Sequence, residues 1–102
     1  MSGFHEDNQV ITETRKKVKT PKRYKVILLN DDYTSMEFVV FILENVFHKS
    51  HQEAFTLMMA IHQTGSGIAG VFSYEIAEMK TALVMEIARK NEYPLRCIME
   101  ED

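Results

Sequence analysis

Several residue types are scarce in this chain of 102 residues, and their scarcity excludes whole classes of protein. The single cysteine, Cys97, cannot form an internal disulfide, and one Cys with seven Met fits a reducing, cytoplasmic setting. No apolar run approaches the roughly 18 residues that span a bilayer, so we expect no membrane contact. The first ten residues have no apolar core and carry Glu6 and Asp7, which makes them a poor signal peptide.

Strong net charge is also missing, because the formal charge is −3, and this argues against a nucleic-acid-binding surface. Residues 1–22 lack hydrophobic periodicity and include most of a basic run at 15–23, which could neutralise phosphates. No aromatic side chain is interleaved before Tyr24, however, and this favours a tether over a nucleic-acid arm. We therefore expect a flexible extension over residues 1–22, one folded domain over residues 23–102, no nucleic acid partner and, by default, a monomer.

The folded part alternates between strand-like and helical hydrophobic patterns. The patterns predict strands at 24–29, 68–72 and 95–100, and helices at 35–47, 50–64 and 74–91. This order, β-α-α-β-α-β, favours an α+β domain in which a three-stranded antiparallel sheet is packed by three helices. The third helix is expected to bury one face, formed by Ile76, Ala77, Leu83, Val84, Ile87 and Ala88.

Capping signals mark the ends of these helices. Thr34 followed by Glu37 fits a capping box, in which the Thr34 hydroxyl would accept a hydrogen bond from the backbone N–H of Glu37. The same signature recurs at the second helix as Ser50 with Glu53, and the N-cap of the third helix is Ser73. The C-cap of the second helix is Gly65.

Between the first strand and the first helix stand three consecutive polar residues, Asn30, Asp31 and Asp32. Such a triplet after a strand is commonly a turn that leads into a helix cap. Here the capping role is assigned to Thr34, which leaves the triplet without a structural duty. We therefore interpret this corner as a binding site.

The chemistry of the corner favours a compact cation. Asn30, Asp31, Asp32 and His62 offer carboxylate, amide and imidazole acceptors, and an ammonium group has three donors to match them. A peptide α-amine fits, and neighbouring carboxylates would raise its pKa above the usual 7.7 to 8. A metal ion held by Asp31, Asp32 and His62 is the alternative, and it would make the protein a metal-dependent hydrolase. That alternative lacks an HExxH motif or clustered ligand spacing, so we expect no metal.

Apolar residues flank the same corner and predict a pocket for one large side chain. Met36 lies one turn into the first helix, and Met58 and Ile61 precede His62. These residues are also common core residues, but methionine adapts well to an aromatic neighbour. An aromatic ring buries about 150 to 250 Å², worth on the order of 4 to 6 kcal/mol before ordering costs. Together, the two halves would recognise a free amine and a bulky side chain on one residue.

Three segments resemble the signature of the ClpS adaptor family. They are Tyr24–Val39, Ala60–Gly65 and Ala69–Phe72, and they occur in the same order as in the family. The resemblance as a whole runs from about Tyr24 to Leu95. ClpS proteins are bacterial N-degron adaptors without enzymatic activity, so the resemblance implies a protein that is not an enzyme and has no cofactor. It further implies binding of proteins that begin with Phe, Tyr, Trp or Leu. Their delivery to the N-terminal domain of an AAA+ unfoldase, ClpA or in some lineages ClpC, for degradation by ClpP, is implied as well.

The resemblance also implies residue roles. Asn30, Asp31 and His62 match the positions that bind the α-amine, with Asp32 and Thr34 beside them, and Met36 matches a gatekeeper that excludes β-branched side chains. The extension before Tyr24 matches a segment that the unfoldase engages. The remaining positions that line the family's pocket are matched by Val39, Met58, Ile61 and Leu95, and Thr34 and Met36 belong to the same pocket. The positions that contact the unfoldase are matched by Glu75 and Lys80.

Two positions depart from the family pattern. Ser35 stands where many members carry Pro at the first helical position, and Ala69 replaces a frequent Cys. We expect neither difference to change specificity.

Overall fold

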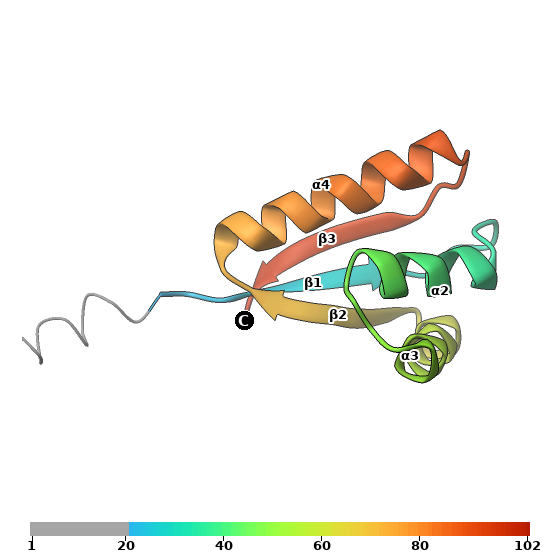
Figure 1. Ribbon diagram of the computed structural model, residues 1–102, viewed down its shortest axis with the longest axis horizontal. Coiled ribbons are helices and arrows are strands. Elements are labelled where there is room, and N and C mark those ends of the chain that lie inside the picture. The colour runs from blue at the N-terminus through green and yellow to red at the C-terminus, as the bar shows by residue number, and fades with distance from the viewer. Residues whose placement is uncertain (1–20) are drawn as a thin grey trace, which may run out of the picture.

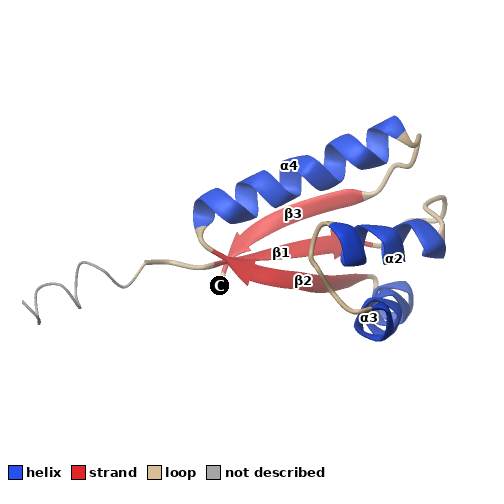
Figure 2. Cartoon of the chain, viewed as in Figure 1, coloured by secondary structure: helices blue, strands red, loops and turns tan. Residues whose placement is uncertain are grey.

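The structure is a computed structural model that describes residues 21–102. The predicted extension over residues 1–22 therefore lies outside the described residues, except for its last two positions. Within 21–102 the elements follow the predicted β-α-α-β-α-β order (Figure 1 and Figure 2). They are β1 (Tyr24–Leu29), α2 (Met36–Asn45), α3 (His51–Thr64), β2 (Ser66–Phe72), α4 (Tyr74–Lys90) and β3 (Arg96–Glu101).

The predicted α+β class and the antiparallel sheet are confirmed, with the strands in the order β2-β1-β3. β1 is central, and Leu29 at its end pairs with Ser66 of β2 and Arg96 of β3. The chain leaves β1 at the end of the sheet opposite the C-terminus, and α2 and α3 lie at that end (Figure 1). The polar corner of residues 30–32 is thus placed beside both helices.

β2 begins earlier than predicted, because Ser66 and Gly67 already pair with β1 and only Gly65 makes the turn. The register shifts between Val26 and Ile27, which leaves Ala69 as the extra residue of a bulge. A Cβ placed on the neighbouring Gly70 would lie 2.5 Å from the ring of Phe72, so glycine allows this ring to lie close against the strand.

One hydrophobic core joins the sheet to all three described helices. Val26 and Leu28 are fully buried, whereas Ile27 between them is only half-buried, so one face of the sheet carries most of the packing. The predicted buried face of α4 is partly wrong, because Ile76 and Leu83 are 40% and 39% exposed. The buried stripe is narrow, and it consists of Ala77, Val84 and Ala88. The small alanines let α4 lie close to the sheet, and Ile76 and Leu83 beside the stripe face solvent, whereas Ile87 packs partly against the core.

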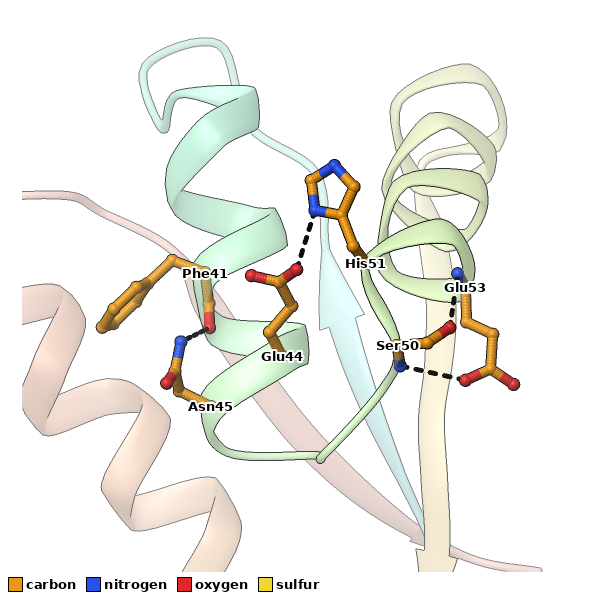
Figure 3. A network of polar contacts seen from close by, with 6 residues as sticks. All are labelled: Phe41, Glu44, Asn45, Ser50, His51 and Glu53. Carbon is orange, nitrogen blue, oxygen red and sulfur yellow. Dashed lines mark hydrogen bonds and ion pairs between the residues drawn. The ribbon is translucent and has the colours of Figure 1, made fainter.

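Local caps set where α3 and α4 begin. The Ser50 side chain accepts a hydrogen bond from the backbone N–H of Glu53, and the Glu53 carboxylate accepts one from the backbone N–H of Ser50 (Figure 3). His51 contacts Glu44 of α2 at 2.8 Å, which links the start of α3 to the last turns of α2 (Figure 3). Gly65 ends α3 with a φ of 99°, a left-handed conformation that suits glycine. Ser73 caps α4 as predicted.

Candidate functional site

The start of α2 differs from the predicted capping box of Thr34 and Glu37, which is wrong. Ser35 is the N-cap, and its side chain accepts a hydrogen bond of 3.1 Å from the backbone N–H of Phe38. Ser35 is therefore outside the helix, in an extended conformation, and serine is a favoured cap residue there. The hydroxyl of Thr34 is unavailable for capping because it donates to Asp31 Oδ2 at 2.7 Å.

Asp31 organises the loop between β1 and α2. Its Oδ1 accepts hydrogen bonds from the backbone N–H groups of Tyr33, at 2.8 Å, and Thr34, at 2.7 Å. Its Oδ2 accepts from the Thr34 hydroxyl, which leaves one lone pair on that oxygen. The inference that residues 30–32 have no structural duty therefore fails for Asp31, which forms an Asx-type turn.

The hydrogen bonds also keep Asp31 ionised. Partial burial by itself would raise the pKa of the Asp31 carboxyl, but the hydrogen bonds from the Thr34 hydroxyl and from the backbone of Thr34 and Tyr33 outweigh it and lower that pKa. The carboxylate is thus negatively charged at neutral pH. One negative charge is held in a defined position at the end of β1.

A backbone contact brings α3 to this loop. The Asn30 N–H donates to the carbonyl of Gly65 at 2.9 Å, and the Gly65 N–H donates to the carbonyl of Ile61 at 2.8 Å. The end of β1 is therefore joined to the last turn of α3, which contains His62. The side chains of Asn30, Asp32 and His62 are exposed, and they form no hydrogen bond or ion pair with another residue of the described part. Their acceptor atoms remain available to a ligand.

A cavity of about 380 Å³ opens at this junction, within the range of about 300 to 1,000 Å³ that is common for ligand pockets. Its base is apolar, because Val39, Met58 and Ile61 are buried, and Met36 at its mouth is 44% exposed. The full lining consists of Asn30, Asp31, Asp32, Tyr33, Thr34, Ser35, Met36, Val39, Met58, Ile61 and His62. Exposed acceptors and a buried apolar base thus belong to a single cavity.

Sequence reasoning missed Tyr33 and Ser35, which both line the cavity. The available signal for Tyr33 was its place directly after the acidic pair, and the structure leaves its side chain 80% exposed. Leu95, which we placed in the pocket, does not line this cavity. It is buried and lines a separate depression beside α4, together with Leu83 and Tyr93.

The two α4 residues expected to contact a partner differ in their surroundings. Glu75 is exposed in the first turn of α4. Lys80 is half-buried, and its Nζ donates to the carbonyl of Val46 at 2.6 Å, just after the last turn of α2. Nζ also lies 5.8 Å and 5.4 Å from the ring centres of Phe47 and Phe72, within the range of a cation–π contact. Lys80 therefore joins α4 to α2.

The alternative of a metal-dependent hydrolase finds no support in the geometry. Among residues 21–102, no three His, Cys, Asp or Glu side chains are grouped so that they could hold a metal ion. Asp31 and His62 line the same cavity, but the hydrogen bonds of the loop occupy most of the acceptor capacity of Asp31. Burial raises the pKa of the Cys97 thiol to about 11, so this thiol is not an activated nucleophile.

Comparison with protein families identifies the chain. The family model for the ATP-dependent Clp protease adaptor protein ClpS matches residues 19–98. This chain belongs to the ClpS family. It is accordingly an adaptor of the ATP-dependent Clp protease and not an enzyme. No helix within residues 21–102 is both long and apolar enough to cross a membrane.

Curated ClpS proteins align along most of their length. The adapter from Hyphomonas neptunium is 55% identical over 91 residues, which cover 89% of this chain and 77% of that protein. The adapter from Phenylobacterium zucineum is 50% identical over 101 residues, which cover 99% and 93%. Among solved structures, Agrobacterium tumefaciens ClpS2 bound to L-phenylalaninamide has a TM-score of 0.78 and 39% identity, and the match covers 80% of this chain and 99% of that one.

Proposed function

We propose that this adaptor binds proteins with a free N-terminal Phe, Tyr, Trp or Leu and delivers them, in the cytoplasm, to an AAA+ unfoldase of the ClpA or ClpC type for degradation by ClpP. The observation that carries the proposal is the single cavity in which exposed acceptors meet a buried apolar base. The ligand of the Agrobacterium relative has the matching parts, a free α-amine and a phenyl side chain on one residue.

The α-amine is assigned to the mouth of the cavity. Asn30, Asp32 and His62 offer exposed acceptors there, and Asp31 adds the remaining lone pair of Oδ2. Each hydrogen bond between a charged amine and such an acceptor contributes about 1.5 to 3 kcal/mol when sheltered from water. In this arrangement Asp31 has two roles, since it also holds the loop that positions Asn30 and Asp32.

The first side chain of the substrate is assigned to the apolar base, where it contacts Val39, Met58 and Ile61. Burial of an aromatic ring of 150 to 250 Å² contributes on the order of 4 to 6 kcal/mol, which is too little alone once association entropy is subtracted. Met36 at the mouth narrows the entry and excludes side chains that branch at Cβ. Binding therefore requires both the amine and a bulky side chain without a branch at Cβ.

Delivery is assigned to the N-terminal part of α4, which carries the exposed Glu75. In Figure 1, α4 begins near the C-terminus, at the end of the sheet opposite the loop that follows β1. A partner docked there leaves the cavity open. Lys80, although tied to Val46, is included in this surface because its side chain is only half-buried.

Fluorescence anisotropy with three labelled peptides, identical except at the first residue, tests the binding part. We expect micromolar or tighter binding for N-terminal Phe and none for N-terminal Val or for the acetylated Phe peptide. Acetylation removes both the charge and two donors while it leaves the ring unchanged. If the acetylated peptide binds as well as the free amine, the acceptors at the mouth do not form an amine site.

A further inference from the structure

A second depression adjoins the cavity, between α2 and α3. It has a volume of about 530 Å³ and is lined by Met36, Glu37, Val40, His51, Phe55 and Met58. Met36 and Met58 also line the first cavity, so these two side chains form the wall that separates the two spaces. None of the binding roles assigned above uses Val40, His51 or Phe55.

The second depression is apolar although it is open to solvent. Phe55 is 51% exposed, and it faces the depression together with Met36 and Val40. Large exposed apolar side chains that gather in one place are typical of a binding surface. The capping box at Ser50 and the contact between His51 and Glu44 hold the start of α3 beside α2, and His51 also lines the depression (Figure 3).

The adjacency of the two spaces suits an extended peptide. Side chains of an extended chain alternate between two sides, so the first and third residues point the same way, about 6 to 7 Å apart. Met36 and Met58 line both spaces, so the two spaces are adjacent, as the sites for the first and third side chains of such a peptide would be. The second residue of such a peptide would point away from both. A peptide whose first side chain fills the cavity therefore brings its third side chain to the depression.

We propose that the depression between α2 and α3 is a subsite for an apolar third residue of the substrate, such as Leu, Met or Phe. This inference rests on the proposed function, because it requires the first residue to occupy the neighbouring cavity. The chemistry of the walls selects the class of side chain: Val40, Phe55 and Met58 offer apolar contact, and the carboxylate of Glu37 at the edge disfavours Asp or Glu. Substrates would thus be ranked by a residue beyond the N-terminal one.

The test compares labelled peptides that begin Phe-Gly-Leu, Phe-Gly-Ser and Phe-Gly-Asp and share all later residues. We expect the Leu peptide to bind about three- to tenfold more tightly than the Ser peptide, which corresponds to partial burial of one aliphatic side chain. The Asp peptide should bind no better than the Ser peptide. A fourth peptide, Phe-Leu-Ser, tests the register and should match Phe-Gly-Ser.

Phe55→Ser removes the largest apolar contact of the subsite, and the exposure of this side chain makes loss of folding unexpected. The variant should bind Phe-Gly-Leu and Phe-Gly-Ser equally, with the affinity for Phe-Gly-Ser unchanged. Met85→Ser, at a similarly exposed position on α4, is the matched control and should keep the preference.

Each failure has a distinct signature. Equal binding of all Phe peptides to the wild-type protein overturns the subsite and leaves the proposed function intact. A preference that persists in Phe55→Ser, or that follows a second-position Leu, also overturns the subsite. If no Phe peptide binds, the proposed function fails, and the subsite fails with it.

Discussion

The hydrogen bond from Thr34 to Asp31 is the contact whose removal says most about this site. Thr34→Val keeps the shape of the side chain and removes only the hydroxyl, which donates to Asp31 Oδ2 at 2.7 Å. The two backbone N–H groups that bind Oδ1 remain. The variant thus separates the side-chain contact from the rest of the turn.

The expected cost follows from the character of the contact. Hydrogen bonds to a charged group contribute about 1.5 to 3 kcal/mol, and the partial exposure of both residues reduces this. We expect Thr34→Val to lower the free energy of unfolding by about 1 to 2 kcal/mol. For a domain of this size, each kcal/mol corresponds to a Tm lower by about 4 to 8 °C.

Urea denaturation measures the loss of stability, and an NMR titration of the Asp31 carboxyl measures the pKa. We expect the pKa of Asp31 to rise in the variant, because one of the hydrogen bonds that lower it is gone while the partial burial that raises it stays. Thr34→Ser should restore both quantities, since it restores the donor. Thr56→Val, at an exposed position on α3, is the control and should leave both nearly unchanged.

A Thr34→Val protein with wild-type stability and a wild-type pKa at Asp31 would contradict this prediction. In that case the side-chain hydrogen bond does not hold the loop. The backbone contacts to Oδ1 would then be sufficient for the turn. Retained affinity for the Phe peptide would extend the same conclusion to the binding site.

Three further predictions concern the gatekeeper, acid stability and the α2–α4 contact. Met36→Ala should let peptides with N-terminal Val or Ile bind, measured by anisotropy, because it widens the mouth of the cavity; unchanged discrimination removes Met36 from this role. Partial burial would raise the pKa of Asp31, but hydrogen bonds lower it below its value in the unfolded chain. The ionised Asp31 carboxylate therefore contributes fully to stability above pH about 4, and this contribution is lost as the pH falls through the pKa of Asp31 in the folded protein. The stability difference between wild type and an Asp31→Asn variant, from urea curves between pH 7 and 3, should therefore shrink in acid, and a constant difference contradicts the assignment. Lys80→Met should lower the free energy of unfolding by about 1 to 2 kcal/mol, since it removes the donor to Val46, whereas Lys90→Met, at an exposed position, should cost little.

Local signals in the sequence were sufficient for the order of the elements. Hydrophobic period, the capping box of Ser50 with Glu53 and the glycine at position 65 each act within a few residues, so they can be read from the chain directly. The six predicted elements appear in the predicted order, with ends that shift by one or two residues. The chemistry of Asn30, Asp31, Asp32 and His62 also follows from residue type, because acceptors predict a cationic ligand wherever they gather.

Whether these acceptors gather was decided by the tertiary structure. The hydrogen bond from the Asn30 N–H to the Gly65 carbonyl brings His62 to the corner, and no spacing along the chain encodes that contact. The same holds for Thr34, whose hydroxyl could either accept a hydrogen bond as a helix cap or donate one to Asp31. It donates to Asp31, and Ser35 caps α2 instead. Competing local hydrogen bonds of similar energy cannot be ranked until the surrounding backbone is placed.

Packing was likewise beyond the reach of pattern alone. Ile76 and Leu83 follow the helical period of a buried face, yet they stay exposed, because the stripe that α4 buries against the sheet is narrow. Leu95 fits a pocket residue by resemblance, yet it lies in a different depression. Periodicity and residue type were thus enough to predict the elements and the chemical character of the site. Which side chains share one cavity depends on distances between segments that are remote along the chain, so it could be known only once the chain was folded.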